Sequence, residues 1–203
     1  MVHWFVIVIK NSHSQYKLKA AQDDIIKGCV ARDRRSQELL YRQQYSAMIK
    51  VCCRYTDNMA DAESIYIRSM QKVLEHISGF KNETEIGAWI RRIVVNTCID
   101  FCRARIQFTM HPVDLVHESV QLVEPEVYHK FSAADAMQMI HELPGNTALV
   151  FNLYAIEGYR HDEIATILGI ATGTSKWHLN EARRLLKQKL SRNLSKEIYS
   201  NVI

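Results

Sequence analysis

A group of cationic and amide side chains near the end of the chain is its strongest chemical feature. Residues 172–192 hold six lysines and arginines against a single acid. Lys176, Asn180, Arg183 and Lys187 recur at intervals of three or four residues, so a helix would carry them on one face. Lysine and arginine neutralise phosphates, and asparagine pairs with base edges. The pattern therefore predicts noncovalent binding of a nucleic acid.

The residues just before this group predict the structure that positions it. Ile164, Ala165 and Leu168 make one side of a short helix apolar, and Gly169 suits a left-handed helix end. Thr172 could cap a second helix. This is the pattern of a helix-turn-helix, whose second helix enters the major groove of duplex DNA. A basic helix that is merely solvated is the alternative, and the turn pattern favours DNA binding.

The second helix of this motif is expected to have a buried side and a side facing DNA. The buried stripe is expected to comprise Ser175, Leu179, Ala182, Leu186 and Leu190. The residues expected to contact duplex DNA are Thr172, Thr174, Lys176, Trp177, His178, Asn180, Arg183, Arg184 and Lys187.

Aromatic residues alternate with cations in a second segment of the chain. Phe80 and Lys81 precede a predicted helix over 85–105, which carries Trp89 near its start. Stacking rings and cations together suit unpaired DNA strands. Ordinary core packing is the alternative for the two aromatic rings. The residues expected to contact single-stranded DNA are Phe80, Lys81, Asn82, Thr84, Trp89, Arg92, Asn96 and Arg103.

Other kinds of site are disfavoured. The five cysteines lack the spacing of a zinc site or a disulfide framework, so we expect reduced thiols in a cytoplasmic protein with no metal and no cofactor. Asp23, Asp24, Asp61 and Glu63 are the close acids, and helix starts explain them. A recombinase or nuclease would need a catalytic constellation that the chain does not offer, so we expect no enzyme and no small-molecule substrate.

Composition predicts an all-α protein. The 203 residues are 47% hydrophobic with only 7 Gly and 3 Pro, and the net charge is +4. We expect two small helical domains joined by a flexible linker, the C-terminal one a helix-turn-helix bundle. Helices are expected over 22–32, 36–55, 61–77, 85–105, 131–143 and 145–157, before the two motif helices. The inner stripe of the helix over 85–105 is expected to comprise Ile86, Ile90, Ile93, Thr97 and Phe101.

The linker and the ends of the chain complete this division. The stretch from Ile106 to Phe131 has four acids, one base and two prolines, which predicts an acidic connector. The first nine residues are apolar but too few to span a membrane, and the sequence assigns no role to them. The expected divisions are an extension over 1–19, a domain over 20–105, a linker over 106–130, a second domain over 131–192 and a tail over 193–203.

The two basic segments, in this order, resemble an extracytoplasmic-function sigma factor of bacterial RNA polymerase. The promoter-melting segment of that family resembles the series Phe80, Trp89, Ile90, Ile93, Asn96, Asp100 and Arg103. Its helix-turn-helix resembles the segment LPGNTALVFNLYAIEGYRHDEIATILGIATGTSKWHLNEARRLLK, and its polymerase-binding helices resemble Tyr41–Tyr55 followed by DAESIYIRSMQKVLEHI.

The resemblance implies a division of labour. The first domain would bind the clamp helices of the largest polymerase subunit and the melted minus-ten element. The second would bind the duplex minus-thirty-five element, and the polymerase flap and an anti-sigma factor would be further partners. Core polymerase would supply the catalysis. The residues implied to bind core polymerase are Asp61, Glu63, Ile65, Tyr66, Arg68 and Met70.

The chain departs from the family pattern at several positions. Ser64, Ile67 and Arg68 stand where the family commonly has Asp, Gln and Glu. A reversed charge at a contact is costly. This leaves open an alternative, a sigma-like DNA-binding regulator that does not bind core polymerase productively. Trp177 also replaces a usually small residue, and Ile86 stands where an aromatic is typical.

Overall fold

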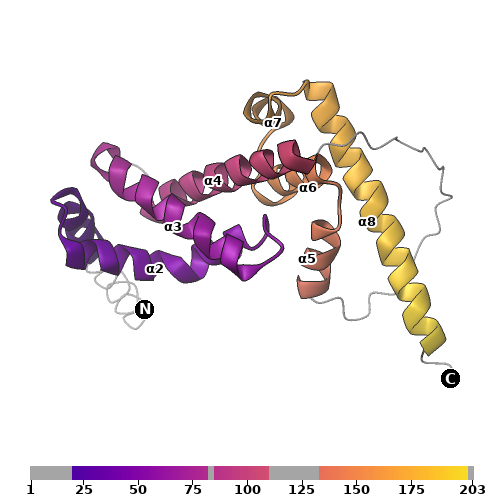
Figure 1. Cartoon of the computed structure of the whole chain (residues 1–203), viewed down its shortest axis with the longest axis horizontal. Coiled ribbons are helices and arrows are strands. Elements are labelled where there is room, and N and C mark those ends of the chain that lie inside the picture. Colours follow the sequence, from indigo (N-terminus) through magenta and orange to yellow (C-terminus); the bar gives the residue numbers. More distant parts are fainter. Residues whose placement is uncertain (1–19, 82–84, 110–132, 201–203) are drawn as a thin grey trace, which may run out of the picture. The chain divides into compact units, whose positions relative to one another are not determined.

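The computed structural model describes residues 20–81, 85–109 and 133–200, and all regular structure within them is helical (Figure 1). The all-α prediction is therefore confirmed. The described residues divide into two compact units. One contains those up to Cys53 and those within Asn58–Cys98, and the other contains Arg54–Asp57 and those from Ile99 onward. Within the described ranges, no helix combines the length and the apolarity that a bilayer crossing needs.

The first unit is a set of helices built on the α2–α3 pair. A helix over 20–30 precedes α2 (Arg34–Cys52), which packs against α3 (Met59–His76). The short η1 (Ile77–Gly79) follows, and α4 (Ile86–Thr109) starts in this unit and continues into the second. The predicted helices over 36–55, 61–77 and 85–105 are thus confirmed, with ends shifted by a few residues.

Side-chain caps set where α2 and α3 begin. The Asp33 carboxylate accepts a hydrogen bond from the Ser36 backbone N–H at 2.8 Å. The Asn58 side-chain oxygen accepts one from the Asp61 N–H, also at 2.8 Å. Each bond satisfies a backbone donor that the first turn of a helix leaves without a partner. Asp61 therefore lies inside the first turn of α3 and does not begin it.

The core of the first unit shows which side of α4 is buried. Ile86, Ile90 and Val94 are buried, whereas Ile93 and Phe101 are only half-buried. The predicted inner stripe was therefore wrong at Ile93, because Val94 continues the four-residue spacing from Ile90. Buried Ile65, Tyr66 and Val73 of α3 and Leu40 of α2 supply other large side chains of the core.

The second unit is a helical bundle that contains the helix-turn-helix. It comprises α5 (Ala133–His141), α6 (Gly145–Phe151), the π-helical turn η2 (Asn152–Ile156), α7 (His161–Leu168) and α8 (Thr172–Ser200). α8 packs against both α6 and α7 (Figure 1). The helix predicted over 145–157 is thus correct in extent, but its last part is wound more loosely than an α-helix. The core of the second unit includes buried Leu149, Val150, Leu153, Ile164, Leu179 and Ala182.

The turn Arg54–Asp57 belongs to this second unit and is fixed there by polar contacts. The Arg54 guanidinium pairs with the Glu157 carboxylate at 2.7 Å, with side chains 16% and 3% exposed. Asn152 donates a hydrogen bond to the Arg54 carbonyl at 3.2 Å. Arg105 forms an ion pair with Asp57. A buried pair of this kind must stay intact, because removing one partner leaves an uncompensated charge.

Candidate nucleic-acid interfaces

The turn between α7 and α8 has the backbone geometry that the sequence predicts. Gly169 ends α7 in the left-handed conformation, with φ 67° and ψ 35°. The Ile170 N–H donates to the Ala165 carbonyl at 3.1 Å, which closes the helix end. At the other end of α7, the Glu163 carboxylate accepts a hydrogen bond from the Arg160 N–H at 2.8 Å. The helix-turn-helix prediction is confirmed at these positions.

The start of α8 differs by one residue from the prediction. α8 includes Thr172 as a helical residue, and the Ala171 carbonyl accepts the first helical hydrogen bond, from the Ser175 N–H at 3.1 Å. Thr172 is therefore not the cap. The buried Ser175 hydroxyl instead lies 2.9 Å from Nδ1 of His161, which ties α8 to the start of α7.

The two sides of α8 are separated as predicted. Ser175, Leu179 and Ala182 are buried, and Leu186 and Leu190 are half-buried. The exposed residues predicted to contact duplex DNA are Thr172, Thr174, Lys176, Trp177, Asn180, Arg183, Arg184 and Lys187. The helix thus carries its cations outward, as binding of a polyanion requires.

His178 lies at the junction of α6 and α8, away from this exposed face. It is half-buried, and its Nδ1 is 3.0 Å from the Thr147 hydroxyl. Burial lowers the pKa of His178 below its ordinary value, which favours the neutral imidazole. The Trp177 ring meets the His178 ring edge-on, with centroids 4.9 Å apart. His178 therefore contacts Thr147 of α6 on one side and the Trp177 ring on the other.

The cations of the exposed face differ in how far they are already paired. Arg184 donates two hydrogen bonds to the Glu181 carboxylate, at 2.9 and 2.7 Å. In contrast, the side chains of Lys176, Arg183 and Lys187 form no hydrogen bond or ion pair with any residue that the structure describes. These three charges are thus available to an external anion.

The second predicted surface lies on α4 and the residues before it. Arg92, Asn96 and Arg103 are all exposed, and they occupy one side of the helix. Phe80 and Trp89 are half-buried with ring centroids 5.3 Å apart and planes inclined by 51°. The two rings are thus neither fully enclosed in the core nor free of it.

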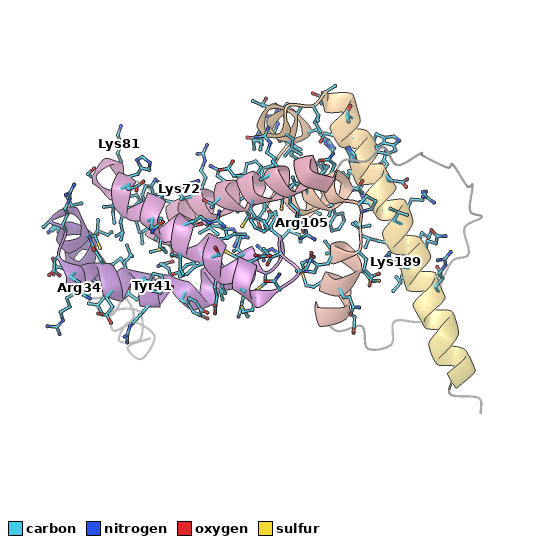
Figure 2. The ribbon with its side chains drawn as sticks, in the orientation of Figure 1. Arg34, Tyr41, Lys72, Lys81, Arg105 and Lys189 are labelled. Atoms are coloured by element: carbon cyan, nitrogen blue, oxygen red, sulfur yellow. The ribbon has the colours of Figure 1, made fainter. Side chains whose placement is uncertain are left out.

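The loop before α4 adds a cation to this surface. Figure 2 shows the Lys81 side chain extending away from the ribbon, and this residue is exposed. Asn82 and Thr84 were also predicted to contact single-stranded DNA, and they lie outside the described residues. The structure therefore brings Phe80 and Trp89 together, with Lys81 beside Phe80 in the chain.

The face of α3 that was predicted to bind polymerase requires a correction. Ile65, Tyr66 and Met70 are buried in the first unit, so the prediction that they form a contact surface was wrong. The Tyr66 hydroxyl is used internally, since it donates to the Tyr41 carbonyl at 2.6 Å. Successive side chains of a helix point about 100° apart, so the predicted residues lie all round α3, and those on its packed side are buried.

The exposed side of α3 includes one apolar residue, Ile67, which is one of the departures from the family pattern. Glu63 and Arg68 are exposed, Asp61 is half-buried, and Ile67 is 48% exposed between them. The Arg68 guanidinium donates hydrogen bonds to the carbonyl and to the hydroxyl of Ser64, one turn earlier in α3. Ile67 is thus an apolar residue among exposed polar side chains on the outer face of α3.

The candidate metal ligands and the cysteines can be located in the part of the chain that is described. The residues there contain no group of three or more side chains able to hold a metal ion. All five cysteines are free thiols. Burial raises the pKa of Cys102 to about 11, and burial also raises the pKa values of Cys29 and Cys53, so these thiols stay protonated near neutral pH.

Comparison with known proteins identifies the family. Family models described as "Sigma-70 region 2" and "Sigma-70, region 4" match residues 40–106 and 134–186, together more than half of the chain. The sigma factor SigV of Bacillus subtilis is 27% identical over 68% of this chain and 81% of its own length. The ECF sigma factor SigM of Mycobacterium tuberculosis is 24% identical over 82% of this chain and 83% of its own. The chain is an extracytoplasmic-function sigma factor.

This sigma factor directs promoter-specific initiation of transcription by RNA polymerase. The region 2 match contains α3 and the Phe80–Trp89 pair, and the region 4 match contains α7 and most of α8. Among solved structures, the sigma factor RpoE of Bartonella quintana, in complex with the anti-sigma factor NepR, is 20% identical. It covers 74% of this chain and 96% of its own, with a TM-score of 0.47. The structure of CnrH in complex with the cytosolic domain of CnrY is 17% identical, and the match covers 85% of this chain and 98% of CnrH with a TM-score of 0.46.

Proposed function

We propose that two separate surfaces of this sigma factor divide promoter recognition. α8 binds the duplex minus-thirty-five element, and α4 with residues 80–84 binds the melted minus-ten element. The observation that carries the proposal is the presence of two exposed cationic helix faces with different companions. One lies on a helix-turn-helix. The other lies beside a half-buried aromatic pair.

The α8 surface suits duplex DNA for electrostatic and geometric reasons. A recognition helix contacts base edges with its first turns, and later residues along it reach the backbone. Lys176 and Asn180 belong to the early turns and suit base edges, whereas Arg183, Arg184 and Lys187 suit phosphates. Each phosphate contact releases cations that were bound to the DNA, so each contact makes the affinity fall more steeply as the salt concentration rises.

The α4 surface suits an unpaired strand. Stacking a base on an aromatic side chain contributes about 1–3 kcal/mol, and adjacent cations hold the backbone. Phe80 and Trp89 keep part of their surface accessible, and Arg92, Asn96 and Lys81 are exposed. We propose that one base of the unpaired strand leaves the stack and enters the loop beside Phe80 and Trp89. Proteins that recognise a single base commonly take it out of the stack in this way.

The outer face of α3 is proposed to bind core polymerase at the clamp helices of its largest subunit. Asp61, Glu63 and Arg68 supply polar contacts, and Ile67 supplies the apolar one. The polymerase flap is the proposed partner of the second domain. An anti-sigma factor is proposed as a further partner that controls access to these surfaces.

The remaining assignments concern the protein as a whole. We propose domains over 20–105 and 131–192, joined by an acidic linker over 106–130 that avoids the DNA both domains bind. The protein itself catalyses no reaction, and it acts in the cytoplasm with the polymerase. It contributes binding energy and positioning, while the polymerase makes the phosphodiester bonds.

Reconstitution with purified core polymerase tests this proposal. The holoenzyme is used to select promoter DNA from a random library, and the selected DNA is sequenced and transcribed. We expect a bipartite motif whose two parts are separated by a fixed spacer, and transcripts that start downstream of it. No enrichment, or no transcript above that of core enzyme alone, would refute the proposed function.

A sigma-like regulator that does not bind core productively is the second candidate. The cation of Arg68 on the outer face of α3 favours it, because a reversed charge at a contact weakens association. A pull-down that recovers no core polymerase, together with sequence-specific duplex binding, would select this candidate. Arg68→Glu would then be expected to restore polymerase binding.

A further inference from the structure

Trp177 is an exposed aromatic residue on the face of α8 proposed to enter the major groove. Its side chain is 39% exposed, and its chain neighbour Lys176 and Asn180 one turn later are exposed polar residues. The Trp177 ring is positioned by an edge-to-face contact with the His178 ring. The Nδ1 of His178 lies in turn within hydrogen-bond distance of the Thr147 hydroxyl. A large apolar ring that is held in place on a polar face is suited to an apolar partner.

Gly173 lies on the same side of α8, one turn before Trp177. Residues four apart in a helix are surface neighbours. Gly173 is exposed, and a Cβ added to it would meet no atom within 4 Å. Its φ is not among the positive values, which occur at Gly158 and Gly169. Neither packing nor backbone conformation therefore requires glycine here, although glycine is a poor helix former.

Gly173 and Trp177 are both exposed and lie one turn apart on α8, and we call this pair of positions the notch because Gly173 leaves the backbone uncovered on the turn before the indole. A glycine that the fold does not need is explained if an external group approaches the backbone closely. The notch lies in the first two turns of α8, the part of a recognition helix that meets base edges. The apolar group that a base edge offers in the major groove is the 5-methyl group of thymine.

We propose that Gly173 and Trp177 are specificity-determining residues whose notch holds the 5-methyl group of one thymine in the duplex upstream element. This inference rests on the proposed role of α8 as the duplex-binding helix. It adds which feature of the DNA the helix selects. Lys176 and Asn180 flank the notch and bind polar groups beside that methyl.

Replacing thymine by uracil removes this methyl group and nothing else, so it provides the test. The duplex that the full-length chain selects from a random library at low salt is synthesised, and each of its thymines is replaced by uracil in turn. Affinity is measured for the holoenzyme and for the full-length chain alone at low salt. One replacement is expected to weaken binding by the wild type roughly fourfold, as for the burial of one methyl group.

Variants at the notch separate this role from general affinity. With Trp177→Ala, the thymine and uracil duplexes are expected to bind equally well. Lys176→Ala removes a cation from the same turn, so it is expected to weaken both duplexes and to preserve their ratio. Gly173→Ala is expected to abolish the thymine preference while making the helix more stable, a combination that a structural defect would not produce.

Two results would overturn the inference. The selected element could contain no thymine whose replacement matters, or the thymine-to-uracil ratio could survive in Trp177→Ala. If the ratio survives while Trp177→Ala weakens every duplex equally, the indole contacts the sugar-phosphate backbone. Failure of the holoenzyme to form or transcribe refutes the proposed function instead, since the ratio is also measured on the chain alone.

Discussion

Two glycines four residues apart in the second unit should respond to alanine with opposite changes in stability. Gly169 has φ 67°, a left-handed conformation that costs an L-residue about 1–2 kcal/mol. A Cβ there would come no closer than 3.8 Å to another atom, which is ordinary contact and adds no steric term. Gly169→Ala should therefore lower the free energy of unfolding by about 1–2 kcal/mol.

At the second glycine, alanine adds helix propensity without backbone strain. Gly173 is in the first turn of α8, and an added Cβ would meet open space. Alanine there gains helix propensity, so Gly173→Ala should raise the free energy of unfolding by up to about 1 kcal/mol. The two variants should thus differ by about 1–3 kcal/mol although the substitution is the same.

Hydrogen exchange read by mass spectrometry on the full chain is the suitable assay, because it reports α7 and α8 separately from the first unit. Gly169→Ala should speed exchange in peptides from these helices, and Gly173→Ala should slow it. Gly79→Ala, in the first unit and with nothing within 4 Å of the added Cβ, is the matched control and should leave these peptides unchanged. Shifts of the same sign in the two variants would refute the reasoning.

Three further predictions concern the exposed faces and the core. Lys176→Ala or Arg183→Ala should lower duplex affinity by about 1–3 kcal/mol if a base contact is lost, or reduce the salt slope by about one if a phosphate contact is lost, in fluorescence anisotropy titrations; unchanged affinity and slope would exclude both contacts. Burial lowers the pKa of His178, so the unfolded chain takes up the proton first and stability should fall as pH drops below about 6.5. Thermal unfolding of His178→Gln should show a smaller fall, and an equal fall would remove the histidine as its cause. Buried Ile65→Ala should cost about 2–5 kcal/mol of stability in urea unfolding, whereas exposed Ile67→Ala should leave stability nearly unchanged and weaken core polymerase binding in a pull-down; the reverse pattern would contradict the corrected α3 face.

Features set by neighbouring residues were predictable from the sequence. The turn at Gly169 depends on a glycine and on an apolar helix immediately before it, and both are local signals. The exposed faces of α8 and α4 follow from polar residues at helical spacing, and Arg92 and Asn96 are indeed exposed. Helix periodicity alone decides these positions once the segment is known to be helical.

Features set by packing were predicted less well. The residues expected to bind polymerase include Ile65 and Tyr66 and lie all round α3, whereas a helix that packs against a core must bury one of its sides. Val94 rather than Ile93 is buried, although residues three and four positions after Ile90 both fit helical spacing, so the spacing alone did not choose between them. The π-helical turn at Asn152–Ile156 also lacked a local signal, since no proline or glycine lies within it.

The most direct test of two surfaces with separate roles is permanganate footprinting of unpaired thymines at the selected promoter. Trp89→Ala and Asn96→Ala holoenzymes should bind the promoter with nearly normal closed-complex affinity but give weak permanganate reactivity at the minus-ten element. Lys176→Ala and Arg183→Ala holoenzymes should show weakened promoter binding, with normal reactivity once the promoter is saturated. Normal melting by the Trp89 and Asn96 variants, or lost melting at saturation in the other pair, would contradict the division between the two surfaces.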